Sequence, residues 1–197
     1  SSISAGADAG FSIVSYTGTG ANATIGHGLS EAPDLYIVKD RDGAGHYWIT
    51  GCAELTTPTT GYLLLDDSQA EADHSSVWNS TEPTSTLVSI GDGAHVNEST
   101  NKYIMYCFHS VEGYSKVGSY VGNADADGTF VYCGFKPAMV ILKRITDGTD
   151  HWVIYDNKRD TFNAGGRYLR PSDSAAEVDG TDSSMAYDFL SNGFKFR

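Results

Sequence analysis

The chain has 197 residues, 40% hydrophobic and 12% aromatic, which is enough apolar content for one folded domain or two small fused ones. Lys and Arg number 13 against 25 Asp and Glu, and the formal net charge of −12 repels a phosphate backbone or an anionic lipid surface. Binding to nucleic acid is therefore not expected. No apolar run approaches the roughly 20 residues that span a bilayer, so membrane insertion is not expected either.

The N-terminal residues and the cysteines indicate a protein that folds where thiols stay reduced. The first ten residues, SSISAGADAG, have neither a basic nor an apolar region, so they do not resemble a secretion signal. Cys52, Cys107 and Cys133 lack zinc-site spacing and cannot all pair within one chain. They are expected to be small buried apolar residues, in a protein made in a cytoplasm.

Short runs rich in Val, Ile, Tyr, Phe and Thr alternate with Gly, Asp and Asn, a pattern typical of strands and turns. In the first half the predicted strands are 11–16, 34–40, 46–50, 62–67, 86–91 and 102–109. The second half offers 114–121, 129–133, 138–144, 151–156, 167–170 and 193–197. The one short helix candidate is 66–73. The sequence predicts an all-β fold, an antiparallel sandwich or jelly-roll-like body.

The chain contains an internal repeat. Five pairs of identical residues lie 104 apart: Tyr16 and Tyr120, Gly18 and Gly122, Pro33 and Pro137, Lys39 and Lys143, Trp48 and Trp152. Further on the spacing becomes 106, as in Tyr62 and Tyr168, Leu63 and Leu169, Ser68 and Ser174, and Glu71 and Glu177. We expect two tandem pseudo-symmetric units, residues 1–113 and 114–197, packed as one compact body. Residues 11–65 and 114–170 are then expected to superpose.

The second unit is predicted to lack its last strand. In KYIMYCFH (102–109) both alternating sets are apolar, which indicates an interior strand buried on both faces. The second unit reaches only GFKFR (193–197), where the first has TLVSIG (86–91). Either the natural chain is longer or another subunit supplies the strand. Without it, the second unit is expected to be poorly soluble or marginally stable.

Several segments in order resemble an uncharacterised domain of bacteriophage proteins. They include GHGLSEAPDLYIVKDR, WNSTEPTSTLVSIGDG, VNESTNKYIMYCFHSVEGYSKVGSYVGN and DFLSNGFKFR. The domain recurs in tail-fibre-like and other virion proteins, of marine and cyanobacterial phages especially. The resemblance implies a structural or adhesive virion component, and it assigns no catalytic residue to this chain. It also implies one more strand after the FKFR segment.

These observations lead to an expected function and two rivals. The chain is expected to be a non-enzymatic virion protein, a tail-fibre or fibre-like module involved in host attachment. Its expected partners are copies of itself, other virion proteins, and a host surface glycan or protein. The rival within the same particle is a capsid decoration or surface-fibre protein. The rival from another class is a soluble carbohydrate-binding, lectin-like module.

One stretch resembles a calcium loop. NADADG (123–128) places Asn123, Asp125 and Asp127 at alternate positions before a glycine, but Gly134 stands where an EF-hand loop has its glutamate. The corresponding stretch of the first unit, TGANAT, has no acid. A solvated turn is the favoured interpretation, and calcium is the weaker alternative. DRDG (40–43) is also expected to close a hairpin.

No catalytic signature is present, although six histidines are available. GHGL (26–29) corresponds to VYCG in the second unit, which has no histidine, so a catalytic use of His27 is not favoured. Adjacent residues such as Asp66 and Asp67 point to opposite faces of a strand and cannot flank one bond. No cofactor is expected.

The tryptophans raise the possibility of sugar binding. Trp48 and Trp152 occupy equivalent places in the two units, which favours a shared role in the core. Trp78 lies in the polar stretch SVWNSTEPTS and is predicted to be the exposed recognition residue.

Overall fold

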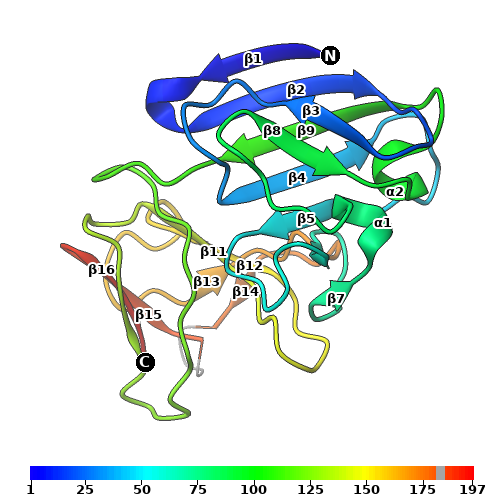
Figure 1. Ribbon diagram of the computed structural model, residues 1–197. Helices are drawn as coiled ribbons and strands as arrows, with labels where there is room; N and C mark the ends of the chain where they lie inside the picture. The colour runs from blue at the N-terminus through cyan, green and yellow to red at the C-terminus, as the bar shows by residue number, and fades with distance from the viewer. Residues whose placement is uncertain (181–184) are drawn as a thin grey trace.

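The computed structural model describes residues 1–180 and 185–197, and its first half is a seven-stranded antiparallel sheet with the order β1-β2-β9-β4-β5-β6-β7. Its strands are β1 (Ser2–Gly6), β2 (Phe11–Thr17), β4 (Leu35–Asp40), β5 (Ile49–Cys52), β6 (Gly61–Leu64), β7 (Ala72–Asp73) and β9 (Lys102–Phe108). A two-stranded antiparallel sheet of β3 (Ala23–Gly26) and β8 (Leu87–Ile90) forms the facing layer (Figure 1). Three short helices complete this half: the 3₁₀-helix η1 (Ala7–Ala9), α1 (Ser75–Trp78) and α2 (Ala94–Asn97).

The core of the first half lies between the sheet and this facing layer. Alternation along the strands places one row of apolar side chains on the inner face, because residues paired across strands share a face. The row comprises Val14, Met105, Val38, Ile49 and Leu64, all buried. Ile25, Val88 and Ile90 of the facing layer join the same core, as do Trp78 of α1 and Val96 of α2. This arrangement is an antiparallel sandwich.

The outer face of the sheet is covered at one end only. Ile13, Tyr106 and Ile37 form a row on this face and are half-buried. The row continues to Thr50 and Leu63, which are fully buried. The prediction that residues 102–109 are buried on both faces is thus correct for the Tyr103, Met105 and Cys107 face and only half correct for the other.

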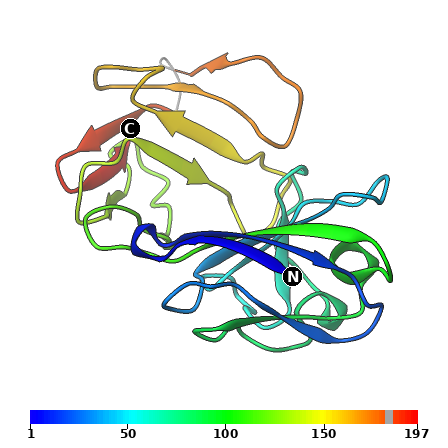
Figure 2. The ribbon, with the colours of Figure 1, turned by 90° about the horizontal axis from the view of Figure 1, so that it is seen from above.

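Trp152 joins the two halves. Its ring packs with Leu55 and Leu63, and its indole N–H donates to the Leu64 carbonyl oxygen at 2.8 Å. The Lys143 ammonium donates to the Ser68 carbonyl oxygen, and the Glu71 N–H donates to that of Ile145. The second half therefore sits on the outer face, at the β5–β6 end of the sheet (Figure 2).

The second half is built from three small antiparallel sheets. Its strands are β10 (Phe130–Tyr132), β11 (Met139–Leu142), β12 (Val153–Asp156), β13 (Arg167–Tyr168), β14 (Val178–Asp179), β15 (Tyr187–Leu190) and β16 (Gly193–Phe196). The pairings are β10-β16-β15, β11-β12 and β13-β14. Its own core centres on Val153, Tyr155, Tyr168, Tyr187, Phe189 and Phe194.

The strand pairings of the two halves obey the repeat offsets. Leu35 pairs with Cys52 in β4–β5, and Met139 pairs with Asp156 in β11–β12, so both partners move by 104. Ala23 to Gly26 pair with Ile90 to Leu87. Adding 106 to each position gives the pairing of β10 with β16. The pairing of β6 with β7 likewise moves by 106 to that of β13 with β14. Superposition of the two halves as whole bodies stays a prediction.

The pairings also refine the alignment of the repeats. Gly26 corresponds to Tyr132, so the counterpart of GHGL is YCGF (132–135) rather than VYCG. Gly28 and Gly134 then coincide, and both adopt positive φ angles, 72° and 85°. A left-handed conformation that favours glycine is therefore kept after the same strand in each half.

The all-β prediction is confirmed, and several of its details are wrong. Residues 114–121 form no strand; only Ser115 joins an isolated bridge, with Val111. Residues 66–73 form no helix and instead contain β7. The sequence analysis missed β1, β3, β7, β14 and β15. Among the described residues, no helix is long and apolar enough to cross a membrane.

Replacing Trp152 tests the contact between the halves. Trp152→Ala is expected to lower the free energy of unfolding by about 3–5 kcal/mol, because it removes a buried ring. Trp48→Ala is the matched control and is expected to cost clearly less, because Trp48 is only half-buried. Urea denaturation followed by circular dichroism measures both. Equal losses would contradict the different burial of the two rings.

Candidate functional site

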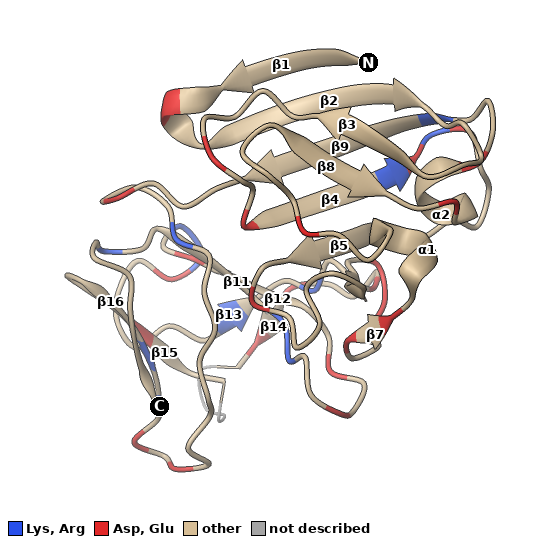
Figure 3. Cartoon of the chain, in the orientation of Figure 1, with Lys and Arg blue, Asp and Glu red and all other residues tan. Residues whose placement is uncertain are grey.

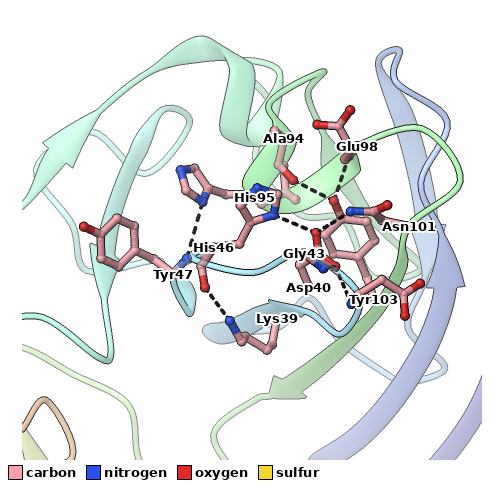
Figure 4. A network of polar contacts seen from close by, with 12 residues as sticks. Lys39, Asp40, Gly43, His46, Tyr47, Ala94, His95, Glu98, Asn101 and Tyr103 are labelled. Atoms are coloured by element: carbon pink, nitrogen blue, oxygen red, sulfur yellow. Dashed lines mark hydrogen bonds and ion pairs between the residues drawn. The ribbon is translucent and has the colours of Figure 1, made fainter.

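The most connected polar cluster surrounds Asp40, the last residue of β4, at the start of the loop that leads to β5 (Figure 4). The Asp40 side chain is fully buried and accepts four hydrogen bonds. The donors are the backbone N–H groups of Asp42 and Gly43, the Asn101 side chain at 2.8 Å and Nδ1 of His46 at 2.6 Å. The DRDG stretch thus closes a hairpin loop, as the sequence predicts.

The pKa of Asp40 is set by two opposing effects. Burial alone would raise it, because a charged carboxylate is poorly solvated inside a protein. The hydrogen bonds from Asn101, Gly43, Asp42 and His46 favour the charged form and together hold the pKa of Asp40 well below its usual range. Asp40 is therefore an ionised acceptor at neutral pH.

Two histidines meet beside this carboxylate. The rings of His46 and His95 pack edge to face, with centroids 4.9 Å apart. Because a carboxylate only accepts, Nδ1 of His46 carries a proton, whereas Nδ1 of His95 accepts from the Tyr47 N–H at 3.3 Å. Burial first, and then the neighbouring His46, lower the pKa of His95. His95 comes from α2, so the cluster ties the hairpin loop to that helix.

An Asp–His pair of this kind fixes the tautomer of the imidazole, as a general base requires. In the hydrogen bonds of the described residues, Nε2 of His46 has no Ser, Thr or Cys partner to serve as nucleophile. The pair alone therefore supplies half of a catalytic arrangement.

The corresponding loop of the second half indicates a structural role for the pair of Asp40 and His46. At the offset of 104, Asp40 and His46 correspond to Arg144 and Asp150, which form an ion pair at 2.9 Å with the acidic residue at the other end of the loop. Lys39 donates to the His46 carbonyl oxygen, and Lys143 likewise donates to that of Asp150. Two different pairs of polar side chains, one hydrogen-bonded and one ionic, thus close the same hairpin loop. The shared Lys and the paired polar residues at the ends of KDRDGAGH and KRITDGTD are the sequence signal for this cluster.

Trp78 is not a surface residue, which corrects the prediction that it is exposed. Its ring is 0% exposed and packs edge to face on Tyr36, and its indole N–H donates to the Gly61 carbonyl oxygen at 2.9 Å. Helix α1 turns this side chain into the core together with Val77, although the residues that follow, NSTEPTS, are mostly polar. The expected core role holds for Trp152, whereas Trp48 is half-buried and stacks on Tyr106.

His27 and the adjacent acids are bound within the fold. His27 is fully buried; its Nδ1 accepts from the Leu29 N–H, and its Nε2 donates to the Thr84 carbonyl oxygen. Burial lowers the pKa of His27, so the ring is neutral. Asp66 accepts from the Trp48 N–H and Asp67 from the Gln69 N–H. Each of these side chains holds a loop.

The NADADG stretch forms consecutive turns. Asn123 and Asp125 accept from the backbone N–H groups two residues on, and the Asn123 side chain donates to the Asp127 carbonyl oxygen. The Asp127 carboxylate pairs with Lys195, which lowers its pKa. Within residues 1–180 and 185–197, no group of three or more His, Cys, Asp or Glu side chains is arranged to hold a metal ion.

A small pocket of about 140 Å³ lies among prolines at one end of β4. Pro33, Asp34, Cys52 and Pro83 contribute to its wall. The Asp34 carboxylate accepts from the Ser110 N–H at 2.6 Å, and burial raises the pKa of the Cys52 thiol. Burial also raises the pKa of Cys107 to about 12, and it raises that of Cys133. All three thiols are free, and none is activated as a nucleophile.

Comparison with known proteins yields one family. The model of a domain of unknown function, DUF7483, matches residues 1–197. Neither the curated proteins nor the solved structures contain a match to the chain.

Removing the Asp40 charge is expected to change the pH dependence of stability. The native pKa of Asp40 lies below its unfolded value of about 3.9, so its stabilising effect is present above pH 4 and is lost as the pH falls. Asp40→Asn is expected to cost about 1–3 kcal/mol at pH 7. The gap from wild type is expected to narrow below pH 4, as urea unfolding between pH 7 and 3 would show. The exposed Asp92→Asn is the control, and a gap that stays constant with pH would contradict the assignment.

A chelator tests the turn at residues 123–128. If Asn123, Asp125 and Asp127 only form turns, EDTA is expected to leave the melting temperature unchanged. A ligand that binds only the native state raises the apparent stability. A fall of several degrees on adding EDTA, reversed by calcium, would therefore show that the loop binds the ion. Asp125→Ala would serve as the control variant, since it removes the central carboxylate.

Proposed function

We propose that the chain, which belongs to the DUF7483 family, is a non-enzymatic structural protein of a bacteriophage virion, a tail-fibre-like module that takes part in host attachment. The resemblance of several sequence segments to a domain of bacteriophage proteins supports the assignment to a virion. The structural observation that carries the proposal is the uneven distribution of exposed apolar side chains.

Eleven large apolar side chains are exposed among the described residues, and seven of them lie between positions 114 and 141. The seven are Tyr114, Tyr120, Val121, Phe130, Tyr132, Met139 and Ile141. Exposed apolar side chains that gather in one segment of a chain favour the binding of another macromolecule to that segment. A component of an assembly has such a partner at all times, namely copies of itself or other virion proteins.

The charge distribution fits a protein partner better than a nucleic acid. Acidic residues are spread over the loops of both halves, and the fewer Lys and Arg residues lie among them (Figure 3). Basic side chains are also engaged by neighbouring acids, as Arg144 is by Asp150 and Arg159 by Glu177. Packaged genome is therefore not the proposed partner.

The absence of an enzymatic role is part of the proposal. The cluster around Asp40 closes a loop that the second half closes with Arg144 and Asp150, and a duplicated structural task accounts for it. The lectin alternative loses its proposed residue, because Trp78 is buried. The capsid decoration alternative is supported by the same exposed surface.

Immunogold electron microscopy tests the location. An antibody against this chain, applied to particles of a phage that encodes it, is expected to label the tail. Labelling of the capsid would replace the tail-fibre proposal by capsid decoration, and unlabelled particles alongside labelled purified protein would overturn both. Pre-immune serum is the control.

A further inference from the structure

In the first half, β9 is bound along both of its edges. It pairs with β2 through seven residue pairs, from Phe11–Phe108 to Thr17–Lys102. On the other side it pairs with β4 through six, from Leu35–Phe108 to Asp40–Tyr103. β4 is thereby satisfied on both sides, by β9 and by β5.

The counterpart of β4 has one open edge. Among the described residues β11 pairs only with β12, and the stretch 115–121, which corresponds to β2, belongs to no strand. The backbone N–H of Asn157 donates to the Ala138 carbonyl oxygen, so the backbone of Ala138 faces the β12 side of the strand. Because backbone hydrogen bonds alternate sides along an antiparallel strand, the N–H and C=O groups of Met139 and Ile141 point toward the open edge.

The side chains beside the open edge of β11 are less buried than the corresponding side chains of the first half. Tyr36 and Val38 of β4 are fully buried, whereas Val140 and Leu142 of β11 are only half-buried although they face the second core. Tyr16 of β2 is 5% exposed and stacks on Tyr103 of β9. Its counterpart Tyr120 is 42% exposed. These less buried residues correspond to residues of β2 and β4, the two strands that lie next to β9 in the first half.

This edge differs from the free edge of β1. β1 ends the large sheet with the sequence SISAG, in which Ile3 is the single large apolar residue, so it is a poorer template for another strand. β11 has the sequence MVIL, and its outward-facing Met139 and Ile141 are 57% and 46% exposed. An apolar unpaired edge of this kind pairs readily with another chain.

We propose that the open edge of β11 binds an extended strand from a neighbouring polypeptide chain, in the antiparallel register that β9 adopts against β4. This deepens the proposed function and rests on it, since an assembly supplies the neighbour. Shifting the β4–β9 pairs by 104 places the residue equivalent to Phe108 opposite Met139 and that equivalent to Tyr106 opposite Ile141. The donor strand therefore needs large apolar residues on both faces, as β9 has.

A synthetic peptide with the sequence of residues 102–109 tests this, with serine in place of Cys107 to prevent oxidation. Titration calorimetry of the 197-residue chain is expected to show binding of one peptide per chain. At a free peptide concentration of about 100 Kd, the melting temperature is expected to rise by roughly 5–10 °C. A scrambled peptide without the alternation is expected not to bind. No binding of the native-pattern peptide would overturn the proposal.

Two variants test the edge itself. Ile141→Pro removes the N–H that points to the open edge and is expected to weaken binding at least about 10-fold, whereas Ile141→Val keeps it and is expected to bind normally. If the proline variant does not fold, Met139→Lys serves instead, because Met139 is exposed and a lysine there blunts an edge. Binding unchanged in a folded variant would overturn the site.

Two further outcomes concern the source of the strand. A chain that dimerises through β11 in analytical ultracentrifugation, without competition from the peptide, would make a second β11 the occupant and overturn the proposal. The proposal would also be overturned if the melting temperature rose only when the peptide was fused to the chain through a glycine-serine linker. Peptide binding by a chain that fails to label any virion would contradict the proposed function while leaving the strand-binding edge intact.

Discussion

The whole first half depends on the backbone pairing of one strand. β9 holds β2 and β4 together, and its inward side chains Tyr103, Met105 and Cys107 are fully buried. Without such a strand, the donors and acceptors of its neighbours have no partners in the sheet, and the apolar residues beside it are uncovered. The second half shows this consequence: β11 is paired on one side, and the stretch that corresponds to β2 remains irregular.

The duplication separates what the fold needs from what is free to vary. Tyr36 packs over Gly51, where a Cβ atom would lie 2.3 Å from its ring; in the second half the large residue is on the other strand, with Tyr155 opposite Val140. The side-chain pair that closes the following loop changes from the hydrogen-bonded Asp40–His46 to the ion pair Arg144–Asp150. Volume and polar pairing are preserved while residue types are exchanged, as expected when the selected property is shape.

Alternation and turn residues were sufficient to predict most of the strands and the all-β class. They failed where pairing or packing decides. Residues 114–121 resemble β2 in sequence but have no β9-like partner. β1 is short and rich in Ser, Ala and Gly, yet it pairs with β2 along its whole length. Trp78 precedes the polar stretch NSTEPTS, yet a single helical turn directs its ring inward. His95 reaches His46 from a distant part of the sequence, so local pattern did not reveal that the two rings meet.

Amide hydrogen exchange of the unmodified chain, followed residue by residue by NMR, measures the open edge directly. Slow exchange is expected at Leu35 and Ile37 of β4, because β9 pairs with this edge of the strand. Fast exchange is expected at Met139 and Ile141, with slower exchange at Val140, which faces β12. Protection of Met139 and Ile141 equal to that of Leu35 and Ile37 would show that the edge is already filled within the chain, and would contradict the account.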